Sequence, residues 1–183
     1  MKKHNLAFVD VETTGFDPIK NEIIELGAII VKQIPAGNTV TLEVIHELEY
    51  KIKPRRLETA NPQALRINGY NEADWLFASE LDQVLKDFSE KASGATFVAH
   101  NLTFDFRFME NAFLESGVAN KLHYGKLDTI SIAFARLHEN EKAQAFSLGA
   151  LASLLEIKNE KAHTALADAR TTFLVYKKLL NLN

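Results

Sequence analysis

Two acidic residues, Asp10 and Glu12, stand one residue apart in the first apolar stretch of the chain, directly before the turn signal Thr-Thr-Gly at 13–15. Side chains two residues apart on a β-strand point to the same face, so we expect these carboxylates to lie side by side. Carboxylates held together away from water repel each other unless a proton or a cation lies between them. The stretch therefore predicts part of a site for a hard cation such as Mg²⁺, and the alternative is a strand end with two hydrated acids.

Two more acids fall on helix faces that should be apolar. The segment from His100 to Met109 runs from a short buried strand into a helix, and Asp105 lies among apolar side chains on its helical wheel. Asp168 borders the apolar stripe of the last predicted helix in the same way. Four carboxylates at such positions indicate one shared site, because the cluster would repel itself without roughly two divalent ions.

The chemistry that fits two such ions is displacement at a phosphodiester. Divalent ions about 4 Å apart clamp the attacking and the leaving oxygen of this reaction. His163 stands five residues before Asp168, at or just before the start of the last helix. Histidine titrates near neutral pH, so neutral His163 can accept the proton of an attacking water, and the alternative is a surface or capping histidine.

The first half of the chain predicts antiparallel strands behind the first acid pair. Residues 22–31 are apolar on both faces, which is typical of a central strand, and a turn at 35–38 leads to a third strand at 39–52. Glu25 interrupts the central strand, and we expect it either to brace the cation site from behind or to lie at the wet end of the strand.

A dense basic cluster follows this meander, at Lys51, Lys53, Arg55 and Arg56. It is interpreted either as an edge that contacts phosphate or as a solvated loop.

The second half of the chain alternates strands with helices, the pattern that implies parallel strand pairing. We expect short strands at 96–100 and 122–127, and helices at 62–68, 80–92, from about 101, at 129–138, at 147–155 and from the segment 162–170 onwards.

Composition limits the class of protein. At 183 residues, 1–183 is expected to form a single domain with one core. The absence of cysteine excludes disulfides, thiolate metal sites and cysteine nucleophiles. The first apolar run stops at Asp10 and no stretch is long enough to span a bilayer, so we expect a cytoplasmic protein without a membrane partner. A net charge of -3 argues against a large footprint on duplex DNA, but allows an enzyme that holds one chain end.

Together these residues resemble the three motifs of the DnaQ-like exonucleases of the DEDDh type, in the same order. The first is Asp10-Val11-Glu12-Thr13-Thr14-Gly15, the second is His100-Asn101 with Phe104-Asp105, and the third is His163 through Asp168. The resemblance spans Leu6 to Tyr176. Thr164 stands where a related subclass has tyrosine, so the histidine subclass fits.

The resemblance implies a ribonuclease-H-like α/β fold, in which a three-strand antiparallel meander and two parallel strands form a five-stranded mixed sheet flanked by helices. It implies 3′-to-5′ exonuclease activity on DNA or RNA that releases nucleoside 5′-monophosphates. The implied ligands of two Mg²⁺ or Mn²⁺ ions are Asp10, Glu12, Asp105 and Asp168, and the implied general base is His163.

For the substrate, the resemblance and the residue types point the same way. We expect the backbone of Thr13, Thr14 and Gly15 to approach the terminal sugar, because glycine lacks a side chain. Phe16 can stack on a base, and the side chains that can hydrogen-bond the last nucleotide are those of Asn68 and Asn101. The alternative for each is ordinary turn chemistry.

The expected partners are single-stranded or frayed 3′ ends of DNA or RNA, and a polymerase or other nucleic-acid-processing protein that delivers the end. DNA proofreading, DNA repair and RNA maturation all remain open as pathways. The alternative activities are an exoribonuclease, a haloacid-dehalogenase-type phosphatase with Asp10 as covalent nucleophile, and a non-catalytic nucleic-acid-interaction module. The phosphatase alternative leaves Asp105 and the spacing from His163 to Asp168 unexplained.

Overall fold

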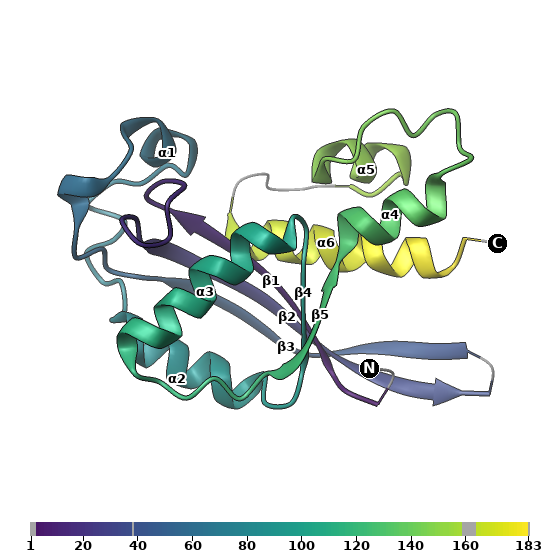
Figure 1. Cartoon of the computed structure of the whole chain (residues 1–183), viewed down its shortest axis with the longest axis horizontal. Coiled ribbons are helices and arrows are strands. Elements are labelled where there is room, and N and C mark those ends of the chain that lie inside the picture. Colours follow the sequence, from purple (N-terminus) through teal and green to yellow (C-terminus); the bar gives the residue numbers. More distant parts are fainter. Residues whose placement is uncertain (1–2, 38, 159–163, 183) are drawn as a thin grey trace.

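A five-stranded mixed sheet with helices on both faces forms the centre of the computed structural model, which describes residues 3–37, 39–158 and 164–182 (Figure 1). The strand order is β3-β2-β1-β4-β5. Antiparallel pairing joins β1 to β2 and β2 to β3, while β4 pairs in parallel with both β1 and β5. The strands are β1 (Leu6–Thr13), β2 (Ile23–Ala36), β3 (Thr39–Lys51), β4 (Thr96–Ala99) and β5 (His123–Asp128). The predicted fold class is confirmed.

The helices form two layers around this sheet. Figure 1 shows α2 and α3 on one face and α6 on the other, with α4 and α5 packed beside α6. The helices are η1 (Leu57–Thr59), α1 (Pro62–Ile67), α2 (Leu81–Lys91), α3 (Leu102–Ser116), α4 (Thr129–Leu137), α5 (Leu148–Leu154) and α6 (Ala165–Leu180). Among the described residues, none of these helices has the length and apolar character needed to cross a membrane.

The alternation of side chains along β1 decides where its acids lie. Leu6 and Phe8 pack against α6, while the odd-numbered residues between and after them pack in the core beneath α2 and α3. Asp10 and Glu12 continue the face of Leu6 and Phe8, because they keep the same parity. Their carboxylates therefore emerge at the end of the strand on the side where α6 begins.

Helix starts follow the capping residues of the sequence. Asn61, Asp128, Ser147 and Thr164 each accept a hydrogen bond from a backbone N–H in the first turn of the helix that follows. The last helix accordingly begins at Ala165, whereas the segment that was expected to open it starts at residue 162.

The first hairpin is longer than the sequence indicated. The central strand, predicted for 22–31, continues to Ala36, so the turn expected at 35–38 starts two residues later. In Figure 1 the far halves of β2 and β3 project beyond the other strands. Pro35 is tolerated there because β2 has only β3 as a hydrogen-bonding neighbour beyond Val31.

The start of α6 lies directly on the backbone of β2. A Cβ atom placed on Gly27 would lie 2.1 Å from the carbonyl carbon of Ala165 and 2.2 Å from the nitrogen of Leu166. Only glycine permits this approach, since backbone atoms cannot move aside as a flexible side chain can. Gly27 therefore determines how closely the first turn of α6 meets the sheet.

Replacing Gly27 with alanine is expected to lower the free energy of unfolding by about 1–3 kcal/mol, the usual cost of overpacking a rigid contact. Chemical denaturation measures this change. Gly149→Ala is the matched control: no atom lies within 4 Å of its added Cβ and it sits in α5. There alanine should stabilise by about 0.5–1 kcal/mol through helix propensity. Equal stabilities for the two variants would contradict the assignment of Gly27 as a close-contact position.

Candidate active site

Three of the four predicted acids meet at the end of β1. Asp10, Glu12 and Asp168 each offer a carboxylate oxygen, and these oxygens lie within 4.8 Å of one another. All three side chains are half-buried, so the cluster is open to solvent on one side. This is the arrangement that the spacing along β1 and the apolar stripe of the last helix predicted.

The first turn of α6 brings Asp168 to this cluster. The side chain of Thr164 accepts a hydrogen bond from the N–H of Ala167, which fixes the start of the helix. The contact of this turn with Gly27 holds it against β2. Asp168 thus reaches the pair on β1 from a segment more than 150 residues later in the chain.

Asp105 approaches the same strand from α3. Its side chain is only 3% exposed, and its Oδ1 accepts a hydrogen bond of 3.1 Å from the backbone N–H of Val11. This N–H is available because β4 is short and pairs with β1 only from Leu6 to Phe8. Asp105 therefore lies beside the first motif, although its oxygens are not among the three that cluster most closely.

Burial and mutual repulsion hold protons on these acids. Burial, with the charges of Asp105 and Asp168, raises the pKa of Asp10 well above its ordinary value. Burial, with the charge of Asp168 next, raises the pKa of Glu12 to about 7. Burial also raises the pKa of Asp105, against the opposing effect of the hydrogen bond from Val11. The folded protein therefore places acids where their charged forms need compensation.

Glu25 lies behind the cluster and contacts α6. It is paired with Glu12 across β1 and β2 and is only 7% exposed. Its Oε2 accepts a 3.4 Å hydrogen bond from the N–H of Ala165, the first residue of α6, and its Oε1 lies 4.0 Å from Lys51 Nζ. Of the two positions expected for Glu25, the structure shows the buried one that braces the site.

The second motif also contains a histidine, His100, whose ring links structural elements around the site. Its Nδ1 lies 2.9 Å from Thr129 Oγ1 at the start of α4, and its Nε2 lies 3.0 Å from the carbonyl oxygen of Phe146. These bonds tie the end of β4 to the segment that precedes α5. Both ring nitrogens are thus occupied by structural partners.

The predicted general base, His163, lies outside the described residues. Its role stays a prediction from the sequence and from its place immediately before the N-cap of α6.

The turn after β1 uses most of its polar side chains internally. Thr13 Oγ1 donates to the carbonyl of Gly15 at 2.6 Å, and Thr14 Oγ1 accepts from the N–H of Glu22 at 2.9 Å. Asn68 donates to the carbonyl of Thr13 at 2.8 Å, which links this turn to the end of α1. What these residues can offer a ligand is therefore backbone, and their side chains perform the turn chemistry that was the stated alternative.

Two other predicted substrate residues remain accessible. Phe16 is 73% exposed, and its ring lies 6.4 Å from that of Phe104, a residue whose ring contact the sequence did not reveal. Asn101 is exposed at the N-cap of α3 with φ 68°, a left-handed conformation that asparagine adopts more readily than most residues. Both line one cavity and are close in sequence to the motifs that carry the acids.

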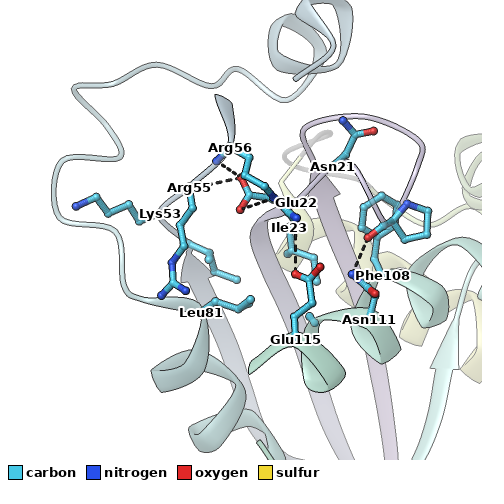
Figure 2. A pocket seen from close by; sticks show the side chains of 13 residues that line it. Asn21, Glu22, Ile23, Lys53, Arg55, Arg56, Leu81, Phe108, Asn111 and Glu115 are labelled. Atoms are coloured by element: carbon cyan, nitrogen blue, oxygen red, sulfur yellow. Dashed lines mark hydrogen bonds and ion pairs between the residues drawn. The ribbon is translucent and has the colours of Figure 1, made fainter. Parts of the chain in front are cut away.

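The two arginines of the basic cluster are bonded to acids, and Figure 2 shows the contacts of both with Glu22 and of Arg56 with Glu115. The backbone N–H groups of both residues donate to Glu22 Oε2, at 2.9 and 2.6 Å. The Arg55 guanidinium lies 2.6 Å from Glu80, and that of Arg56 lies 3.4 Å from Glu115. The solvated-loop interpretation fits these contacts better than a phosphate-binding edge.

Comparison with known proteins places this geometry in a family. Residues 7–176 match the RNase T family model, which is described as an exonuclease. The chain belongs to this exonuclease family. The predicted resemblance to the DnaQ-like exonuclease family is thereby confirmed.

Curated relatives of this exonuclease differ in length. Ribonuclease T of Haemophilus influenzae (strain 86-028NP) is 31% identical over 187 residues, which cover 96% of this chain and 79% of that protein. A PolC-type DNA polymerase III of Caldanaerobacter subterraneus is 29% identical over 171 residues, covering 93% of this chain but 11% of the polymerase. This chain thus covers most of the length of ribonuclease T and only a small part of the length of the polymerase.

Solved structures share the fold of the exonuclease. Escherichia coli exonuclease I in complex with a dA16 oligonucleotide superposes with a TM-score of 0.76 at 18% identity, over 97% of this chain and 40% of that one. Exonuclease I from Methylocaldum szegediense gives 0.72 at 20% identity, again over 97% of this chain and 40% of the other. A zinc-bound form of the E. coli enzyme with single-stranded DNA is also similar, with a TM-score of 0.74 at 18% identity.

The raised pKa values of the acids predict how the stability of the metal-free exonuclease depends on pH. The folded state holds protons that the unfolded chain releases near pH 4, so stability is fully present below that pH and falls as pH rises toward about 7. Even ~2 kcal/mol corresponds to about 4–8 °C in Tm for a domain of this size. We therefore expect a higher Tm at pH 5.5 than at pH 8 in buffer with chelator, measured by calorimetry.

Asp105→Asn is the matched variant, since an amide keeps an acceptor for Val11 but cannot ionise. Its Tm should vary less between pH 5.5 and pH 8 than that of the wild type. A wild-type Tm that rises over this interval would show that the acids are not destabilising in their charged forms.

Proposed function

We propose that this exonuclease removes nucleotides one at a time from the 3′ end of single-stranded DNA, releasing nucleoside 5′-monophosphates. The observation that carries the proposal is the convergence of Asp10, Glu12 and Asp168, with Asp105 bonded to the same strand. Phe16 and Asn101 stand exposed at the mouth of this site, where a chain end can enter.

The donor set of the cluster fits divalent cations with oxygen ligands. It contains carboxylates alone among the described residues, and burial together with mutual repulsion raises their pKa values, so a cation between them would stabilise their charged forms. We propose that Asp10, Glu12, Asp105 and Asp168 hold two Mg²⁺ or Mn²⁺ ions. When bound, such ions stabilise charge on the phosphoryl oxygens and lower the pKa of a nucleophilic water.

The residues of the chain then have separate tasks in hydrolysis. His163 accepts a proton from the attacking water, whose oxygen forms a bond to the terminal phosphorus. The bond between that phosphorus and the 3′ oxygen of the preceding nucleotide breaks, so the shortened strand keeps a 3′-hydroxyl and the released nucleotide keeps the 5′-phosphate. The backbone of Thr13, Thr14 and Gly15 lines the terminal sugar, Phe16 stacks on its base, and Asn101 bonds to the last nucleotide, while Asn68 supports the turn.

The alternative activities can be weighed on the site. Membership in the exonuclease family sets aside the haloacid-dehalogenase-type phosphatase. The meeting of the predicted acids argues against a non-catalytic module. An exoribonuclease is the second candidate, supported by the 31% identity to ribonuclease T over most of that protein. Rates on matched DNA and RNA oligomers decide between the two.

We also propose that residues 1–183 work as one exonuclease domain that depends on a partner to deliver the 3′ end. The net charge of -3 and the pairing of Arg55 and Arg56 with acids leave little positive surface to grip a long strand. The match to PolC-type polymerases supports a polymerase or another nucleic-acid-processing protein as that partner. A cytoplasmic location stays a prediction.

The central test is degradation of a 5′-labelled single-stranded oligonucleotide. We expect Mg²⁺-dependent shortening from the 3′ end, abolished by EDTA. Asp10→Asn should lower kcat by at least about 10³-fold, since charge stabilisation in the transition state is lost. The same variant should raise the Tm in metal-free buffer at pH 8, because a repelling charge is removed, which separates loss of activity from unfolding. Endonucleolytic products or activity in EDTA would refute the proposal.

The proton-acceptor role of His163 has its own test. His163→Ala should lower kcat by about 10²–10⁴-fold, the usual contribution of a general base. Wild-type kcat should rise with pH as the imidazole loses its proton, and this rise should vanish in the variant. Metal affinity, measured by titration calorimetry, should stay unchanged. His138→Ala, at an exposed position after α4, is the control with normal activity expected. Near-normal turnover of His163→Ala would remove it from the mechanism.

A further inference from the structure

A cavity of about 230 Å³ opens between the loop that follows β1 and the first two turns of α3. Its lining includes Phe16, Pro18, Asn101, Thr103, Phe104 and Arg107. One wall is formed by Phe16 and Pro18, which follow the turn after Glu12. The other wall includes Phe104, which directly precedes Asp105 in the sequence. The cavity therefore lies beside the two motifs that carry Asp10, Glu12 and Asp105.

The loop wall of this cavity is held in place by hydrogen bonds. Asn111 of α3 donates to the carbonyl of Pro18 at 2.7 Å, as Figure 2 shows. Asn21 accepts from the N–H of Asp17 at 3.0 Å and donates to the carbonyl of Thr59 at 2.9 Å. A wall that is fixed before binding loses little conformational entropy when a ligand enters.

Arg107 is the cation of the cavity, and it is placed differently from other arginines nearby. It is exposed on α3, one turn after Thr103, and within residues 3–37, 39–158 and 164–182 its side chain forms no hydrogen bond or ion pair. On the other side of the loop, Arg55 and Arg56 are paired with acids. Pro18 also lines the pocket drawn in Figure 2, which contains Arg55 and Arg56, so the loop lies between these paired arginines and Arg107.

The charge balance around the cavity favours an anionic ligand at Arg107. The two divalent ions proposed above offset the charge of the four carboxylates but not that of the next phosphate in the strand, and Arg107 is the cation that lines this cavity. A guanidinium forms bidentate hydrogen bonds to phosphate and is weakly hydrated, which suits a half-open cavity. The exposed ring of Phe16, 6.4 Å from that of Phe104, lines the same cavity and offers an apolar surface beside the guanidinium.

We propose that Arg107 binds the internucleotide phosphate immediately 5′ of the scissile one. The inference rests on the proposed function, because it takes the substrate to be a strand with its 3′ end at the acids. Arg107 then selects for substrates at least three nucleotides long, since shorter ones lack this phosphate. The guanidinium holds the strand in register without touching the reacting atoms.

Binding to a 5′-fluorescein oligothymidylate, measured by fluorescence anisotropy with Ca²⁺ under conditions where no cleavage is seen, tests the contact. Arg107→Gln should raise Kd about tenfold, the loss of one charge-assisted hydrogen-bonded contact. The slope of log Kd against log salt should fall by about 0.7, the value for one phosphate on a single strand. Lys177→Gln removes the same charge from the far part of α6 and should leave Kd nearly unchanged.

Neutral methylphosphonates placed at each internucleotide linkage in turn locate the phosphate. In the wild type, the linkage immediately 5′ of the scissile one should weaken binding about tenfold, and in Arg107→Gln the same substitution should cause no further loss. Additive losses at every linkage, or an unchanged Kd for Arg107→Gln, would overturn the proposal.

A small ester separates failure of this inference from failure of the proposed function. The p-nitrophenyl ester of thymidine 5′-monophosphate carries the scissile phosphate but no upstream phosphate. Arg107→Gln should hydrolyse it with wild-type kcat/KM, while its KM on the oligothymidylate rises about tenfold. Equal loss on both substrates would overturn the proposed phosphate contact. If the wild type hydrolyses neither substrate, the exonuclease function itself fails, whereas the binding experiment still decides the role of Arg107.

Discussion

The close contact between the first turn of α6 and the backbone of β2 determines the geometry of the whole site. Gly27 allows the approach because it has no side chain, and Glu25 fastens it by accepting the N–H of Ala165. Asp168 lies in this turn, so its distance from Asp10 depends on how closely the helix meets the sheet. Glu25 is buried behind the cluster, and its charge adds to the effects that raise the pKa values of Asp10 and Glu12. Positioning and charge accumulation therefore have one structural origin.

The acid cluster is destabilising in the protein alone. Burial and repulsion raise the pKa values of Asp10, Glu12 and Asp105, which means that folding works against their charged forms. The large buried surfaces on both faces of the sheet offset this cost, with Phe8 and Phe173 on the α6 side and Phe88 on the other. Functional sites commonly lower the stability of the fold in this way, because the negative charge that destabilises the folded protein also attracts the cations that the site binds.

Positive charge is distributed unevenly around the site. Most of the basic cluster after β3 holds the frame together, with Arg55 and Arg56 bonded through backbone and side chain to Glu22, Glu80 and Glu115. This network anchors the segment between β3 and α1 to the loop before β2. Arg107, on the α3 side of the loop, lies outside this network and lines the cavity there.

The sequence alone determined the four acids, the mixed sheet and most helix starts. These follow from local rules: side-chain alternation on strands, the helical period and capping residues all act over a few positions, so acids on apolar faces are visible without coordinates. The tertiary structure decided what depends on contacts between distant segments. It showed that Glu25 bonds to Ala165, 140 residues away, that the side chains of Thr13 and Asn68 form hydrogen bonds within the turn, and that Arg55 and Arg56 are paired with acids. No local pattern encodes these pairings, because which side chains meet depends on how the helices pack on the sheet.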